Sequence, residues 1–275
     1  MNTLTLNQHP LLPANWHDLK NLQSAWFYSM VGNLALMVFC LVAQQFDERT
    51  LFDVSVWSKP FKFALSLAVY FGTLLWMWQF VPTSFRHSKA GAWLVGIPTF
   101  MGFFEMAYIA YQAALGEASH FNFTSNFHAT MYSLMGFGAT CMVVILGWLA
   151  IVIGRHNSMR QPLILSIVLG LVLTLVLGGG FGGYMGSAGG HWVNAPATDA
   201  NSVAFFNWTR NGGDLRVAHF FGMHAMQLIP LFAMLLPQKT NNNLKLSLIV
   251  TFACAFSAFT TMTFVQAINA QPFMA

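Results

Sequence analysis

The sequence is poor in charged residues. Only 7% of its 275 residues are Asp, Glu, Lys or Arg, whereas a soluble domain carries about 25%. No polar stretch is long enough to fold as a separate soluble domain, and 56% of the residues are hydrophobic. This composition excludes an ordinary soluble protein and predicts an integral membrane protein.

The sequence also lacks any basic run or face of the kind that binds nucleic acid. The net charge is +4, but Lys and Arg lie in short connections between apolar segments. We therefore expect a lipid bilayer, and no nucleic acid, as partner. Three cysteines, Cys40, Cys141 and Cys254, lie in different apolar segments. They are typical of small core residues and give no information on the redox compartment.

Apolar runs long enough to cross a bilayer, which takes about 20 residues each, occur seven times. They span residues 25–45, 61–80, 92–115, 127–153, 162–184, 215–236 and 244–268. Pro162 suits the first turn of a helix, and Asp214 is a plausible N-cap. The sequence therefore predicts an all-α fold, a single transmembrane domain over residues 1–275 with about seven helices.

Charged residues outside the spans are distributed unevenly between the two sides. The N-terminal segment and the even-numbered connections carry seven Lys and Arg against one Asp. The other side carries five Lys and Arg against six Asp and Glu. Because basic loops stay in the cytoplasm, we expect a cytoplasmic N-terminus and an external C-terminus.

The longest connection, residues 185–214, lies on the predicted outer side. It contains Trp192, Phe205, Phe206 and Trp208, which are too apolar to remain solvated. We therefore expect this segment to fold over the bundle. Just before it, glycines recur every four residues from residue 178 to residue 190, a spacing that favours close approach of helices.

One acidic residue, Glu105, falls inside a predicted span. Tyr108 and Gln112 follow at i+3 and i+7 and share its helical face. An ionisable group in hydrocarbon is costly and is a candidate for function. Two interpretations stay open: a hydrogen-bonded carboxyl that ties helices together, or a metal ligand or proton acceptor.

Histidines concentrate on the predicted outer side. His128, His219 and His224 enter spans there, and with Glu105 they suit a transition metal (copper, iron or zinc) or haem. His219 and His224 lie about 140° apart on a regular helix, so they cannot chelate one ion together. Partners would come from other helices, with Tyr132 as a further catalytic candidate beside Glu105.

Three basic residues near the outer ends of spans form an anion-binding candidate: Lys59, Lys62 and Arg216. Their cationic groups suit a carboxylate, a phosphate or a lipid headgroup. The alternative is pairing with nearby acids or extension of the lysines to the lipid headgroups. A retinal protein is excluded, because the last span has no lysine near its middle.

Three stretches resemble a family of bacterial polytopic membrane proteins to which no function is assigned: Trp57–Phe63, Ser119–Asn122 and Gly213–Ala225. The resemblance implies a multi-pass protein of the bacterial inner membrane and nothing about activity.

Three functional hypotheses follow from the sequence. The first is a redox protein with a His/Glu site for a metal or haem in the outer leaflet. The second is a proton-coupled carrier or channel for a small polar solute, and the third is an accessory subunit of a membrane complex. A small-molecule or quinone-like ligand fits the first two. The sequence leaves open whether the protein is an enzyme and which oligomer it forms.

Overall fold

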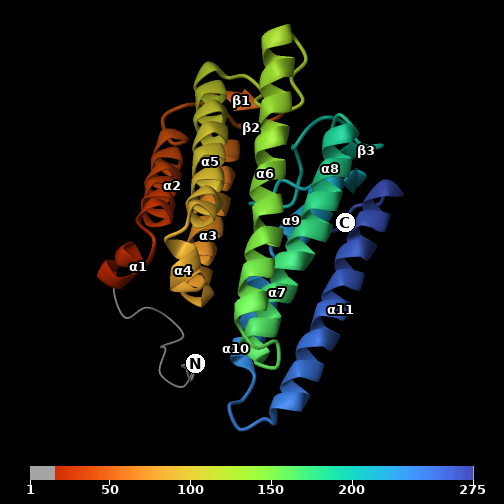
Figure 1. Cartoon of the computed structure of the whole chain (residues 1–275). Helices are drawn as coiled ribbons and strands as arrows, with labels where there is room; N and C mark the ends of the chain where they lie inside the picture. Colours follow the sequence, from red (N-terminus) through yellow and green to blue (C-terminus); the bar gives the residue numbers. More distant parts are fainter. Residues whose placement is uncertain (1–15, 275) are drawn as a thin grey trace.

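The chain forms a bundle of long helices, as seen in a computed structural model that describes residues 16–274 (Figure 1). The first half contains α1 (Trp16–Leu22), α2 (Ser24–Ala43), α3 (Ser58–Met77), η2 (Trp78–Phe80), α4 (Thr83–Arg86), α5 (Lys89–Leu115) and α6 (Asn126–His156). The second half contains α7 (Pro162–Leu173), η3 (Thr174–Gly178), α8 (Gly179–Ser187), α9 (Leu215–Met223), α10 (Ala225–Leu235) and α11 (Asn242–Ile268).

Six of these helical segments are long and apolar enough to cross a membrane, and a bent pair raises the number to seven. The predicted helical fold, with about seven helices that could cross a membrane, is therefore confirmed. Most predicted spans agree with the helices to within a few residues, because length and hydropathy alone define them. Pro162 is the first residue of α7, and the Asp214 side chain caps α9 by accepting from the Arg216 amide.

The sixth predicted span, residues 215–236, is not one straight helix, which corrects the sequence prediction. α9 and α10 meet at His224 with a bend of 50°. In a continuous helix the Met226 amide would donate to the carbonyl four residues earlier. Here it donates instead to Thr174 Oγ1 on η3, at 2.9 Å. A tertiary hydrogen bond thus replaces a helical one at the break.

The break lies where α9 crosses η3, a π-helical turn between α7 and α8. Gly178 and Gly222 bring the two backbones into contact: a Cβ on Gly222 would lie 2.6 Å from the Gly178 nitrogen. The close approach expected from the glycine spacing is confirmed at Gly178. It is also confirmed at Gly182, where a Cβ would lie 2.7 Å from the His219 ring.

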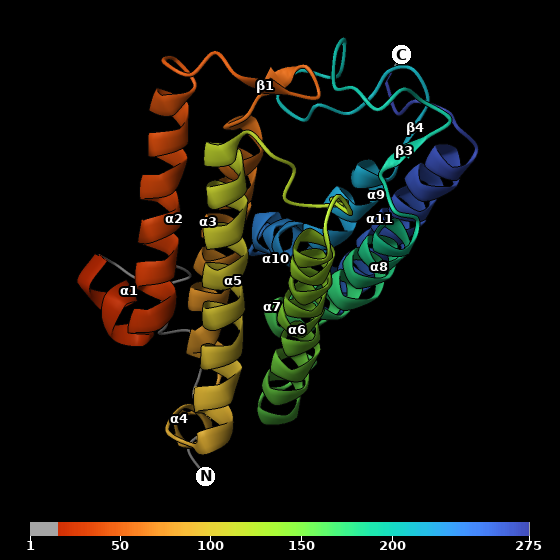
Figure 2. The ribbon, with the colours of Figure 1, turned by 90° about the horizontal axis from the view of Figure 1, so that it is seen from above.

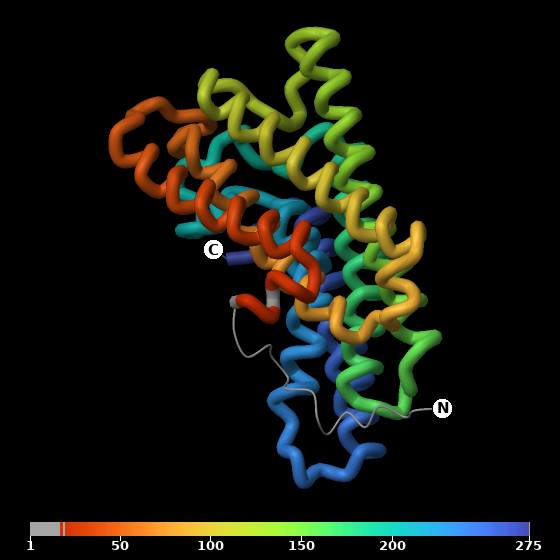
Figure 3. Tube along the Cα trace, turned by 60° about the vertical axis from the view of Figure 1, so that its left-hand side comes forward, coloured from red at the N-terminus to blue at the C-terminus, as the bar shows by residue number. Residues whose placement is uncertain are grey.

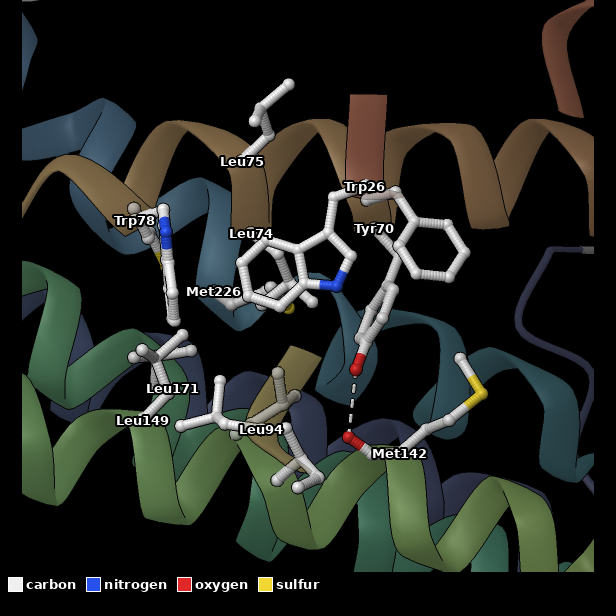
Figure 4. Packing of buried hydrophobic residues seen from close by; sticks show 14 of the residues in the cluster. Trp26, Tyr70, Leu74, Leu75, Trp78, Leu94, Met142, Leu149, Leu171 and Met226 are labelled. Carbon is white, nitrogen blue, oxygen red and sulfur yellow. Dashed lines mark hydrogen bonds between the residues drawn. The ribbon is translucent and has the colours of Figure 1, made fainter. Parts of the chain in front are cut away.

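The largest hydrophobic core lies between α2, α3, α5, α6 and α7. Trp26 and Trp78 pack edge to face with ring centroids 5.0 Å apart. The Tyr70 hydroxyl donates to the Met142 carbonyl at 2.9 Å, so its buried oxygen is satisfied (Figure 4). In Figure 3 the tubes of α2 and α5 (red and yellow) lie in the upper part of the view, and those of α10 and α11 (blue) extend below them.

One end of the bundle is closed by irregular chain, and we call it the hairpin end (Figure 2). It holds β1 (Thr50–Leu51) paired with β2 (Val54–Ser55), and β3 (Trp192–Val193) paired with β4 (Gly213–Asp214). The Asp199 amide donates to the Phe52 carbonyl at 3.0 Å and so joins the two hairpins.

The segment 188–214 folds over this end, as predicted from its aromatic residues. Trp208 is 5% exposed and stacks on Phe206, with ring centroids 4.3 Å apart. Phe205 differs, since it remains 53% exposed while one edge meets Phe61. The segment therefore forms a cover fixed to the bundle by aromatic packing.

Candidate functional site

Glu105 of α5 lies beneath this cover and faces His120, which belongs to the connection between α5 and α6. Glu105 is 7% exposed, and its Oε1 lies 3.7 Å from His120 Nε2. Lys59, in the first turn of α3, acts electrostatically on both groups. We call these three residues the Glu105 site.

The connection 116–125 orients His120 through its own hydrogen bonds. Gly116 ends α5 in the left-handed conformation, with φ of 76°. Asn122 holds the loop closed: its Nδ2 donates to the Ala118 carbonyl at 2.9 Å, and its Oδ1 accepts from Thr124 Oγ1 at 2.7 Å. Phe121 takes a φ of 53°, which is uncommon for a bulky residue. This local conformation turns the preceding imidazole inward.

Burial lowers the pKa of His120 well below its usual value, and the nearby Lys59 ammonium lowers that pKa further. The ring is therefore neutral at pH 7. It packs between Phe63, with centroids 5.5 Å apart, and Tyr132, at 6.1 Å. A neutral imidazole beside a buried carboxyl can accept or donate a proton in a site with little water.

The two lysines of α3 lack a carboxylate partner. Within residues 16–274, no Asp or Glu oxygen lies within 4 Å of Lys59 or Lys62. Lys62 Nζ reaches the Phe206 carbonyl at 3.4 Å, and Lys59 Nζ lies 5.8 Å from the Phe63 ring centroid. Two of the three predicted anion-binding residues thus have no direct ion pair within residues 16–274.

Arg216, the third predicted anion-binding residue, is fully engaged. Its guanidinium pairs with Asp214 at 2.7 Å and with Asp199 at 2.9 Å. It also donates to the Asn207 carbonyl. Arg216 therefore fastens the cover to α9 and is not available as a free anion ligand in this conformation.

His191, which the sequence did not single out, belongs to the cover itself. Its ring is 3.8 Å from the Trp192 ring, and its Nε2 is buried without a hydrogen-bond partner in the part of the chain that the structure describes. Burial lowers its pKa to about 2, and the positive charges of Arg216, Lys59 and Lys62 contribute. Basic side chains of α3, of α9 and of the cover therefore lie close enough to act on one another electrostatically.

Both ring nitrogens of His128, which was predicted as a ligand, contact polar side chains at or just after the C-terminal end of α5. Its Nδ1 lies 3.2 Å from the Tyr108 hydroxyl and 3.3 Å from Gln112 Nε2. Its Nε2 lies 3.4 Å from Glu117. The polar face predicted for α5 is confirmed, because Glu105, Tyr108 and Gln112 are all buried. Its partner is His128 from the next helix.

His219 and His224 lie on the broken span and face different neighbours. His219 Nδ1 is 2.9 Å from the Gly178 carbonyl. The His224 ring packs on Phe220 at 4.4 Å and faces the Gln227 amide. Tyr132, predicted as catalytic, directs its hydroxyl to the Gly186 carbonyl at 3.2 Å while its ring borders His120.

The predicted ligands Glu105, His128, His219 and His224 thus do not gather in one cavity. Among residues 16–274, no three His, Cys, Asp or Glu side chains form a group that could hold a metal ion. The structure therefore does not assemble Glu105 and these three histidines into one group among the described residues. The reason is local: each imidazole has its own neighbours on a different helix.

Comparison with known proteins adds no assignment: no protein family, no curated protein and no solved structure matches this chain. The described residues thus form a helical bundle with six or seven helices that could cross a membrane, and a buried carboxyl, imidazole and amine lie together at its hairpin end.

Two residues of this region, His120 and His191, were missed by reasoning from the sequence. His120 lies in a connection, where histidines are usually solvated, and only its place in the stretch Ser119–Asn122 distinguished it. His191 lies in the long connection, whose burial was expected from its aromatics. For His191 the available signal was a histidine in a segment predicted to fold over the bundle.

Proposed function

We propose that the protein is a proton-coupled carrier of the bacterial inner membrane, which binds a small anionic solute at the hairpin end. The observation that carries this proposal is the pair Lys59 and Lys62, which no carboxylate within residues 16–274 approaches to ion-pair distance. Positive charge held in a bundle is costly without a partner. A carboxylate or phosphate of the solute would compensate that charge.

The proton in this proposal is exchanged by Glu105 and His120. Glu105 Oε1 and His120 Nε2 lie 3.7 Å apart, so a small approach of the two side chains would let a proton pass between them. In this proposal a positive charge on Lys59 attracts the carboxylate of Glu105. Arrival of an anion at Lys59 would weaken that effect and favour uptake of a proton by Glu105, which links solute and proton.

The break in the sixth span supports transport in addition to binding. Carriers commonly have discontinuous helices near the middle of the membrane, where two bundle parts move against each other. Here α9 and α10 bend by 50° at His224, beside the π-helical turn η3. At the contact between η3 and α9, Gly178 and Gly222 have no side chains that would interlock and oppose such a motion.

We place the hairpin end outside the cell, with a cytoplasmic N-terminus and an external C-terminus. The support is the charge distribution, since the opposite side carries seven Lys and Arg against one Asp. Alkaline phosphatase and green fluorescent protein fused to each terminus would test it. Phosphatase activity at the N-terminus would reverse the placement of the site.

Proteoliposomes provide the test of function. Purified protein would be assayed with acetate, succinate and inorganic phosphate for solute uptake under an imposed pH gradient. We expect uptake of at least one anion with proton movement, loss of uptake in Lys59→Gln, and uptake without proton coupling in Glu105→Gln. Lys89→Gln, at the exposed start of α5 on the other end of the bundle, is the matched control. Equal uptake by all four proteins would refute the proposal.

The second candidate is the redox protein with haem or a transition metal, and one observation favours it. His219 Nδ1 meets the Gly178 carbonyl at 2.9 Å, the arrangement that fixes the tautomer of a ligating histidine and leaves Nε2 for the metal. A group that would be held by a single histidine does not require the cluster of three side chains that is lacking among the described residues. His128 or His224 would have to move to supply another.

A visible absorption spectrum and elemental analysis of the purified protein would decide this candidate. A haem band, or a metal at stoichiometric amount, that is lost in His219→Ala would support it. A colourless, metal-free protein with intact uptake would remove it and leave the carrier.

A further inference from the structure

A cavity of about 400 Å³ lies at the hairpin end, between the β1–β2 hairpin and the connection that follows α5. Phe52, from the turn between the two strands, forms one part of its wall, and residues of the connection 116–125 form the rest. We call this cavity the loop pocket. Cavities of this size commonly hold small molecules.

Three phenylalanine rings line the loop pocket: Phe52, Phe121 and Phe123. Phe52 and Phe123 are 42% and 59% exposed, although they lie in connections outside the spans. Phe52 and Phe121 also have a positive φ, of 55° and 53°. This backbone conformation is uncommon for a bulky residue, and such conformations occur most often at ligand sites. Two of the three rings in one wall thus stand on an unfavourable backbone.

Aromatic packing outside the loop pocket fixes the three rings in place. Phe52 packs edge to face on Trp192 of the cover, with ring centroids 5.4 Å apart. Phe121 and Phe123 both pack on Tyr132 of α6, with centroid distances of 5.2 Å and 5.5 Å. The rings therefore need little rearrangement to receive a ligand, which lowers the cost of binding.

Glu117 adds a carboxylate to this aromatic wall. Its side chain is 49% exposed, and its Oε2 lies 3.4 Å from His128 Nε2 and 3.5 Å from Gln112 Nε2. Its Oε1 makes no hydrogen bond to the described residues, and no Lys or Arg nitrogen among residues 16–274 lies within 4 Å of the carboxylate. The faces of phenyl rings carry partial negative charge. Rings and carboxylate therefore attract the same kind of group, a cation.

The amide of Asn122, which also lines the loop pocket, is used by the loop itself. Its Oδ1 accepts from the Thr124 amide at 3.1 Å and from Thr124 Oγ1 at 2.7 Å, and its Nδ2 donates to the Ala118 carbonyl at 2.9 Å. A primary ammonium needs acceptors for three N–H groups, whereas a quaternary ammonium has no N–H group. A wall of rings with one free carboxylate oxygen therefore suits the quaternary cation better.

We propose that the loop pocket binds a quaternary ammonium group, which lies against the three phenylalanine rings and whose charge is compensated by Glu117. The group belongs either to a small solute such as choline or to a lipid headgroup. The site is separate from the proposed carrier function, because none of the three residues of the Glu105 site lines it. It also selects the opposite charge, so the uptake assay and the test below succeed or fail independently.

The first test compares choline with dimethylbutanol, its neutral analogue in which a carbon atom replaces the ammonium nitrogen. Binding to the full-length protein in dodecyl maltoside, a detergent without an ammonium group, would be measured by saturation-transfer NMR on the ligand methyl signals. We expect saturable binding of choline and binding of dimethylbutanol that is weaker by about fivefold or more. Equal affinity for the two compounds, or no saturable binding of choline, would overturn the proposal.

Substitutions then locate the choline. Phe52→Leu, Phe123→Leu and Glu117→Gln should each weaken choline binding by about two- to fivefold, the effect of one exposed cation–π or ionic contact. Phe127→Leu is the matched control for the rings, because Phe127 is 59% exposed like Phe123 and does not line the loop pocket. Glu48→Gln, at an exposed acid of the same end, is the control for charge. Unchanged affinity in all three wall variants would place choline elsewhere and overturn the proposal.

A third ligand distinguishes the two sources of the cation. Dihexanoyl phosphatidylcholine, used below its micelle-forming concentration, carries the same ammonium group on a lipid. If it binds more tightly than choline and Glu117→Gln weakens it, the site recognises a lipid headgroup. If it binds equally or more weakly, the site recognises a free solute. Both results support the loop pocket, provided that the wall variants weaken choline binding.

Discussion

Replacing Arg216 by Gln should detach the cover from the bundle. The guanidinium lies between Asp214, whose side chain is 0% exposed, and Asp199, at 9%. Asp214 Oδ2 also accepts from the Thr209 amide at 3.0 Å, so this carboxylate joins the cover to the start of α9. Glutamine cannot neutralise either acid, and two nearly buried carboxylates would remain unpaired.

The magnitude follows from the burial. Removing one partner of a buried ion pair costs about 3–5 kcal/mol. The Arg216 side chain is 23% exposed, and water entering there would relieve part of that cost, so we expect the lower part of the range, about 3 kcal/mol. Arg216→Lys keeps the charge but loses the two-pronged geometry, and its effect should fall between glutamine and wild type.

Two measurements check this. The free energy of unfolding would be measured by SDS titration in mixed micelles, and protease cleavage within residues 188–214 would report on the cover itself. Arg49→Gln is the matched control at the same end, since Arg49 pairs with Asp47 but its side chain is 51% exposed. If Arg216→Gln changes neither stability nor cleavage more than Arg49→Gln does, the cover does not depend on this ion pair.

Three further predictions use the same unfolding assay. Gly222→Ala should cost about 3 kcal/mol or more, because its Cβ would meet the Gly178 backbone; Gly180→Ala, with no atom near its Cβ, should not destabilise. Thr174→Val should cost about 1–3 kcal/mol by leaving the amide at the break unpaired, and Thr174→Ser should not. The lowered pKa of His191 makes the fold lose stability as pH falls below about 6.5, by at most about 1.4 kcal/mol per pH unit. His191→Gln should flatten that slope; an unchanged slope would contradict the burial of the ring.

The part of the fold that the sequence predicts is the part governed by hydropathy. Apolar runs of sufficient length identified the spans, and Asp214 marked the start of α9. The helical spacing of Glu105, Tyr108 and Gln112 placed one polar face, and all three are buried. Each of these depends on local pattern, which a single sequence contains.

The parts that the sequence did not predict depend on contacts between distant segments. The break at His224 is stabilised by a hydrogen bond from Met226 to Thr174, which is 52 residues away, and the apolar pattern continues through it without interruption. The inward turn of His120 requires a positive φ at Phe121. Positive φ is uncommon for phenylalanine, so the sequence does not predict this conformation. Which neighbour each histidine meets is equally a matter of helix rotation, so the separate surroundings of His128 and His219 could not be read from spacing.

The cover over the hairpin end has a consequence for biogenesis. Lys62 meets the Phe206 carbonyl, which is 144 residues later in the chain. At a synthesis rate of about 5–20 residues per second, the early helices wait about 7–30 seconds before that segment leaves the ribosome. During this interval Lys59 and Glu105 are already in the membrane without the cover that later encloses them. The nascent chain therefore needs the insertion machinery, or water held within it, to shelter its polar residues until the second half arrives.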